Sequence, residues 1–76
     1  MRIEPYTAFG EKVDSELTEL GLSQRWLAQE IDVDRKTITN WLTGKTRPSE
    51  GRVHQIAAAV VCDADELQDL LDNPPS

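Results

Sequence analysis

Residues 35–40 form a short segment rich in side chains that recognise polar partners: Arg35, Lys36, Thr39 and Asn40. Arginine and lysine can donate to guanine N7 and O6, asparagine can pair with adenine, and a threonine methyl can touch a thymine methyl. The same side chains could equally be the ordinary solvated surface of a helix, as most exposed polar residues are. Which of the two holds depends on the elements that position the segment.

The residue types that catalysis and metal binding require are sparse. His54 is the only histidine and has no carboxylate or nucleophile at a diagnostic spacing. Cys62 is the only cysteine, so the chain can form no internal disulfide, and the two residues together make no metal-ligand cluster. We therefore expect no enzyme, no metal, no cofactor and no small-molecule substrate.

The charge of the chain is acidic overall but uneven along the sequence. The net charge is −6, whereas six basic and four acidic residues between Arg25 and Arg52 leave +2 there and −8 in the rest. Phosphate neutralisation by Lys and Arg supplies most of the affinity of nucleic-acid binding. One modestly positive face on an acidic body is compatible with DNA, with low non-specific affinity and strong salt sensitivity.

Length and composition predict one domain over residues 1–76, with a core from about 8 to 71 and a tail at 72–76. A chain this short buries only about 60% of its unfolded surface and cannot support two cores. No apolar run approaches the roughly 20 residues that a membrane span needs. Residues 1–8 show no secretion-signal pattern, so we expect a cytoplasmic protein.

Apolar residues recur at three- and four-residue steps over about residues 8–20, which predicts an amphipathic helix. Thr7 is placed to cap its start and Gly21 to end it. A second, shorter helix follows the N-cap Ser23 and ends near Ile31.

A third helix is predicted from Arg35 to Thr43, with Asp34 as its N-cap and Gly44 at its end. Ile38 and Trp41 lie three residues apart and face inward. Almost every other side chain of this helix is therefore expected to be exposed.

The second and third helices are joined by a three-residue turn, 32–34, which is the arrangement of a helix-turn-helix over residues 23–44. Such a pair presents its later helix outward. The apolar residues expected to hold the pair together are Leu27, Ala28, Ile31, Val33 and Ile38.

A polar connector, residues 45–48, precedes a fourth helix capped by Ser49, and Asp63 starts a fifth. No strand pattern or internal repeat is present in the sequence. The predicted fold class is all-α, a compact bundle of about five short helices. The apolar faces of the last two helices are Val53, Ile56, Ala57 and Val60, and Leu67, Leu70 and Leu71.

The order of these pieces resembles the lambda-repressor-like (Cro/C1-type, XRE) helix-turn-helix family over about residues 8–71. Each piece alone is a weak signal, but their order and spacing together are specific. The matching stretches are SQRWLA at 23–28, VDRKTI at 33–38, Trp41, GK at 44–45, PS at 48–49, IA at 56–57 and DEL at 65–67.

The resemblance implies a third helix in the major groove, with base contacts from Arg35, Lys36, Thr39 and Asn40. Phosphate contacts are expected from Gln24, because it lies at a helix N-terminus that favours an anion. The family pattern implies further phosphate contacts from the connector after the third helix. The remaining phosphate candidates are Lys45, Thr46 and Arg47 in the connector, and Ser23, Arg25 and Thr37.

Three residues depart from the family pattern. Asp32 stands where glycine is common, so we expect a left-handed conformation there. Val61 replaces another frequent glycine, and since a β-branched residue is unfavourable in that conformation, the fourth helix is expected to end differently. Asp34 places a carboxylate near the docking surface, where it could reject wrong bases or accept from cytosine N4.

The resemblance implies a transcription regulator of phage or prokaryotic repressor type that binds double-stranded operator DNA in a prokaryotic cell or infected host. Family members often bind as dimers, and the fifth-helix leucines could pair or could close the core. The alternative is a protein-interaction module of antitoxin or anti-repressor type, which the acidic body favours. A third possibility is the DNA-binding half of a longer repressor, with Pro74 and Pro75 opening a linker.

Overall fold

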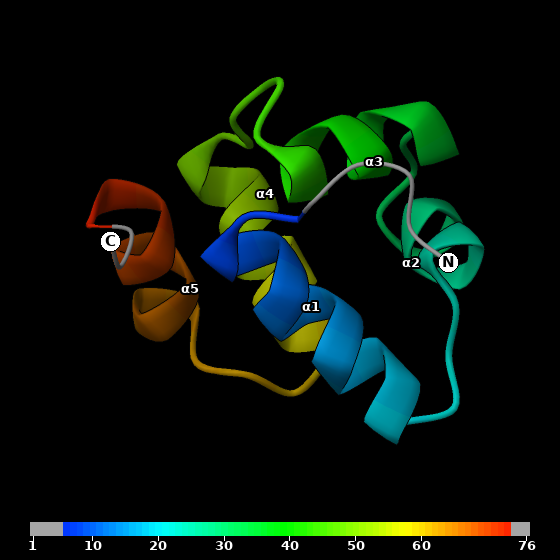
Figure 1. Ribbon diagram of the computed structural model, residues 1–76. Coiled ribbons are helices and arrows are strands. Elements are labelled where there is room, and N and C mark those ends of the chain that lie inside the picture. The colour runs from blue at the N-terminus through cyan, green and yellow to red at the C-terminus, as the bar shows by residue number, and fades with distance from the viewer. Residues whose placement is uncertain (1–5, 74–76) are drawn as a thin grey trace.

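The computed structural model describes residues 6–73, which fold into five helices around one core (Figure 1). The predicted all-α bundle is confirmed. The predictions for residues 1–5 and for the linker at Pro74 and Pro75 lie outside the described residues. Between residues 6 and 73, no helix is long and apolar enough to cross a membrane. The helices are α1 (Ala8–Glu19), α2 (Gln24–Glu30), α3 (Arg35–Thr43), α4 (Glu50–Ala59) and α5 (Ala64–Asp72).

Most of the predicted helix caps are present. The hydroxyl oxygens of Thr7, Ser23 and Ser49 accept hydrogen bonds, at 3.0–3.3 Å, from the backbone N–H three residues further on. Gly44 ends α3 in the left-handed conformation, with φ 83°. The predicted cap at Asp34 is wrong, because this residue occupies the N-cap position but its side chain makes no capping hydrogen bond. Asp34 is exposed, so water solvates its carboxylate without a backbone partner.

Two non-glycine residues in the described chain have positive φ: Asp32 at 59° and Val61 at 54°. The left-handed conformation predicted for Asp32 is confirmed. The prediction that α4 ends differently is wrong: after α1, α2 and α4 alike, a backbone N–H donates to the carbonyl five residues earlier at 2.8–2.9 Å. Val61 therefore adopts a conformation that its branched side chain disfavours, because the hydrogen bond from Cys62 N–H to the Ala57 carbonyl satisfies backbone groups at the end of α4.

The core takes buried side chains from all five helices. Leu42 corrects the expectation that only Ile38 and Trp41 of α3 face inward: it is 1% exposed, because it follows Ile38 by four residues and so shares its face. Leu67 is fully buried and closes the core, whereas Leu70 and Leu71 are half-buried. The buried set is Phe9, Val13, Leu17, Leu27, Ala28, Ile31, Ile38, Trp41, Leu42, Val53, Ile56, Ala57, Val60 and Leu67.

A close contact between α1 and α3 sets the position of α3. A Cβ placed on Gly10 would lie 2.1 Å from the carbonyl oxygen of Leu42, so only glycine fits at this point. The same oxygen accepts from the backbone N–H of Thr7 at 3.0 Å and from its hydroxyl at 3.2 Å. The start of α1 therefore holds the end of α3, while the first turns of α3 lie free of α1's N-terminus (Figure 1).

Candidate nucleic-acid interface

The exposed face of α3 carries the side chains predicted to read bases. Arg35 and Lys36 are exposed, and Thr39 and Asn40 are half-buried. The opposite face is anchored in the core by Ile38, Trp41 and Leu42. Among residues 6–73, neither the guanidinium of Arg35 nor the ammonium of Lys36 makes a hydrogen bond or ion pair, so both cations are available to a partner outside the domain.

Thr39 uses its hydroxyl within the helix. Its Oγ1 donates to the carbonyl oxygen of Arg35 at 3.2 Å. This bond holds the side chain in one orientation, and its methyl group remains for an apolar contact. Such a contact is the one that a thymine methyl would make with threonine.

The structure brings several predicted base and phosphate contacts together in one surface hollow of about 330 Å³. The predicted phosphate contacts in it come from the start of α2, and the predicted base contacts come from α3. Its lining residues are Asp14, Leu22, Ser23, Gln24, Arg25, Arg35 and Thr39. Residues that are up to 25 positions apart in sequence, from Asp14 to Thr39, therefore share one surface.

Gln24 is engaged in a hydrogen-bond network that the sequence analysis missed. Its Nε2 donates to Tyr6 Oη at 2.5 Å and to Asp14 Oδ1 at 3.3 Å. Since the amide has two N–H donors, a bond from this amide to phosphate requires one of these partners to be exchanged. Ser23 is also engaged, as the cap of α2, through its bond from Trp26 N–H.

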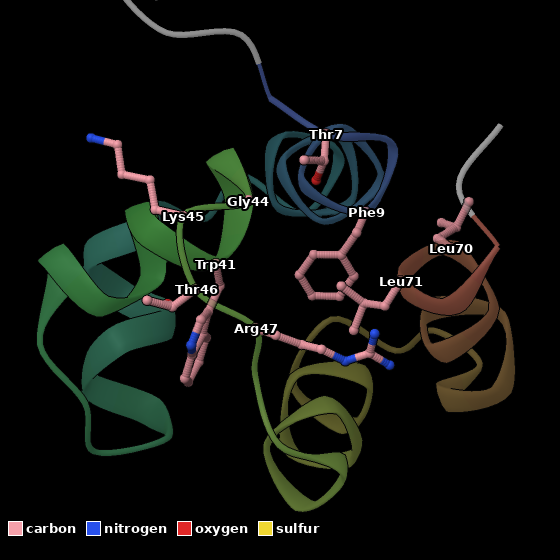
Figure 2. A pocket seen from close by; sticks show the side chains of 9 residues that line it. All are labelled: Thr7, Phe9, Trp41, Gly44, Lys45, Thr46, Arg47, Leu70 and Leu71. Carbon is pink, nitrogen blue, oxygen red and sulfur yellow. The ribbon is translucent and has the colours of Figure 1, made fainter. Parts of the chain in front are cut away.

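The connector after α3 is folded back onto the end of that helix. The backbone N–H groups of Lys45 and Thr46 donate to the carbonyl oxygen of Asn40 at 2.9 and 3.3 Å. Figure 2 shows that the side chains of Lys45 and Arg47 leave the connector in opposite directions, Arg47 running toward Leu71 on α5. The connector candidates thus do not share one orientation.

Arg47 is paired with a carboxylate of the last helix. Its Nη2 donates to Oδ1 of Asp72. The Arg47 guanidinium beside Asp72 lowers the pKa of that carboxyl below its usual value. No pattern within the connector could have indicated this partner, which lies 25 residues further along the chain.

One of the six basic residues between Arg25 and Arg52 makes hydrogen bonds within the domain. Arg52 Nη1 donates to the carbonyl oxygen of Ile31 at 2.8 Å and to Gln55 Oε1 at 3.0 Å. It satisfies a carbonyl at the end of α2 and ties α2 to α4. The positive charge for docking is therefore carried by the other five basic residues of the segment, of which Arg47 is paired with Asp72.

A second hollow, of about 350 Å³, lies beside the connector (Figure 2). Its apolar wall is made of Phe9, Trp41, Leu70 and Leu71, and Thr7, Gly44, Lys45, Thr46 and Arg47 complete it.

No group of three or more histidine, cysteine, aspartate or glutamate residues able to hold a metal ion occurs in the part of the chain that the structure describes. Burial raises the pKa of the Cys62 thiol, which disfavours the reactive thiolate.

A family model described as helix-turn-helix matches residues 15–67. The chain belongs to the Cro/C1-type helix-turn-helix family. Membership implies DNA binding, as in transcription regulators, and the family is typically without catalytic activity. No curated protein matches the sequence.

The matched stretch contains α2 and α3 entirely and includes every residue predicted to contact bases or phosphates. Tyr6, Asp14 and Asp72, the residues that engage Gln24 and Arg47, lie outside the matched stretch. The partners of Gln24 and Arg47 are thus supplied by parts of this chain that the family match does not cover.

Proposed function

We propose that this helix-turn-helix domain binds double-stranded DNA sequence-specifically as a transcription regulator of phage or prokaryotic repressor type. The observation that carries the proposal is that α3 has one buried and one exposed face. Ile38, Trp41 and Leu42 are buried, while Arg35 and Lys36 are exposed, and Arg35 lines the hollow at the start of α2. A helix anchored in this way can enter a major groove.

In this proposal Arg35, Lys36, Thr39 and Asn40 read bases, and the phosphate contacts come from two groups around them. One group is at the start of α2 and in α3; the other is the connector. Contacts to phosphate position the protein, whereas contacts to base edges carry the specificity. The phosphate set is Ser23, Gln24, Arg25, Thr37, Lys45, Thr46 and Arg47.

The test of sequence-specific binding is a selection of bound sites from random DNA duplexes, followed by titration of variants on the recovered site. Arg35→Ala or Asn40→Ala should weaken binding by about 1–3 kcal/mol and relax the preference at one base pair. The matched control is Lys12→Ala, which removes from α1 a basic side chain that is paired with Glu16 at 3.2 Å. If the selection enriched no motif, sequence-specific binding would be refuted.

The same titration separates docking from reading. Lys45→Ala should weaken binding to the selected and to random duplexes about equally and reduce the salt slope by about one unit. Gln24→Ala removes no charge, so it should lower affinity with little change in slope. If Lys45→Ala bound both duplexes like the wild type, the connector would not belong to the docking surface.

The protein-interaction alternative requires an apolar anchor on the presented face. Within the described residues, the large apolar side chains of α3 are all buried, which favours DNA as the partner.

We further propose a homodimer, for which half-buried Leu70 and Leu71 offer an apolar contact on α5. Sedimentation equilibrium with and without a selected palindromic site tests it, and a one-to-one complex on every site would refute it.

A further inference from the structure

Arg47 lies in a connector where phosphate contacts are proposed, yet its guanidinium already has an anionic partner. Nη2 of Arg47 donates to Oδ1 of Asp72 at the end of α5. Nε2 of Gln68 donates to the same carboxylate oxygen at 3.3 Å. The carboxylate is thus held by the connector and by its own helix.

We propose that Asp72 is an affinity-determining residue of this domain, whose carboxylate competes with a DNA phosphate for the Arg47 guanidinium. The inference rests on the proposed DNA-binding function. Carboxylates and phosphates use the same planar set of N–H donors on a guanidinium, so the two anions cannot both be fully bound by it. While it is paired with Asp72, Arg47 adds no net positive charge to the docking surface.

The exposure of the pair allows this exchange. The side chains of Arg47 and Asp72 are 54% and 48% exposed, so solvent and an incoming phosphate can reach both groups. An exposed ion pair is weak, and breaking it in favour of a phosphate has a small cost. The carboxyl of Asp72 is charged at neutral pH, like that of any exposed aspartate, and the Arg47 guanidinium lowers its pKa further.

The position of Asp72 in α5 separates this role from a role in folding. Asp72 is the last residue of α5, where a negative charge faces the negative end of the helix dipole. The charge of the carboxylate therefore does not stabilise α5, and an asparagine oxygen at this position can keep the hydrogen bond from Gln68. Asp72 can be replaced without removing a buried contact, because it is exposed.

The decisive variant is Asp72→Asn, which keeps the size of the side chain and an oxygen that can accept from Gln68. On a selected duplex at low salt, affinity should rise about two- to fivefold, the range that corresponds to an exposed ion pair. The dependence of affinity on salt should steepen by up to about 0.9 unit, because Arg47 then neutralises one more phosphate.

Two controls distinguish local competition from a general charge effect. Asp69→Asn removes the same charge one turn earlier in α5, from a carboxylate that accepts from Asn73 at 3.1 Å. It should change affinity less than Asp72→Asn does. In an Arg47→Ala background, Asp72→Asn should have no effect beyond that of Asp69→Asn.

The outcomes separate this inference from the proposed function. A wild-type protein that selects DNA, with Asp72→Asn no tighter than Asp69→Asn, would overturn the competition while leaving DNA binding intact. An equal gain for Asp72→Asn with and without Arg47 would also overturn it. Failure of the wild type to bind any duplex would refute the proposed function and this inference together. Circular dichroism melts of each variant confirm that the compared proteins are folded.

Discussion

Val61 is a strained residue, and we expect its replacement by glycine to stabilise the protein. It has φ 54° and is 83% exposed. A residue with a Cβ in this conformation costs about 1–2 kcal/mol, which glycine does not incur. Glycine in turn loses about 0.5–1 kcal/mol through the greater freedom of the unfolded chain. Little packing is lost with so exposed a side chain, so Val61→Gly should raise the free energy of unfolding by about 0.5–1 kcal/mol.

Thermal unfolding followed by circular dichroism measures this change. For a domain of this size, 1 kcal/mol shifts Tm by about 4–8 °C, so a rise of about 2–8 °C is expected. The matched control is Ala58→Gly, at an exposed position inside α4, which should lower stability by about 1 kcal/mol. A Tm for Val61→Gly at or below that of the wild type would refute the argument from backbone strain.

Three further predictions follow from tertiary contacts. Gly10→Ala should destabilise the fold by about 1–3 kcal/mol in denaturant titration, because its Cβ would meet a carbonyl oxygen of α3 at 2.1 Å. The control Gly51→Ala, with open space around it in α4, should not destabilise the fold. An equal effect of both variants would contradict the steric argument. Arg52→Met should cost about 1 kcal/mol through loss of its bond to the Ile31 carbonyl, and an unchanged denaturation midpoint would show that the bond contributes nothing. Because the pKa of Asp72 is lowered in the folded state, its carboxylate stabilises that state above the unfolded pKa of about 3.9, and the effect is lost as the pH falls through the lower folded value. The difference in stability between wild type and Asp72→Asn should therefore shrink on acidification. A constant difference from pH 7 to pH 2 would argue against the ion pair of Arg47 and Asp72.

The sequence by itself predicted the elements of this protein well, because their signals are local. The caps at Thr7, Ser23 and Ser49 act on backbone groups three residues away, and the end of α3 depends on Gly44. The conformation of Asp32 follows from a position where glycine is common in the family. Apolar periodicity then indicated which faces are buried, and the family match supports the same helix-turn-helix.

Tertiary structure decided which side chains of the candidate site are already engaged. The partners of Gln24 lie 18 and 10 residues before it, at Tyr6 and Asp14, and the partner of Arg47 lies 25 residues after it, at Asp72. These distances along the chain exceed any helical period, so no local pattern could indicate them. The pairs exist because α1 packs against α3 while α5 packs against α1 and α4, which brings Tyr6 and Asp14 to Gln24 and Asp72 to the connector. The sequence thus determined which residues face outward, and the packing of distant helices decided which of those residues must exchange a partner before they can contact DNA.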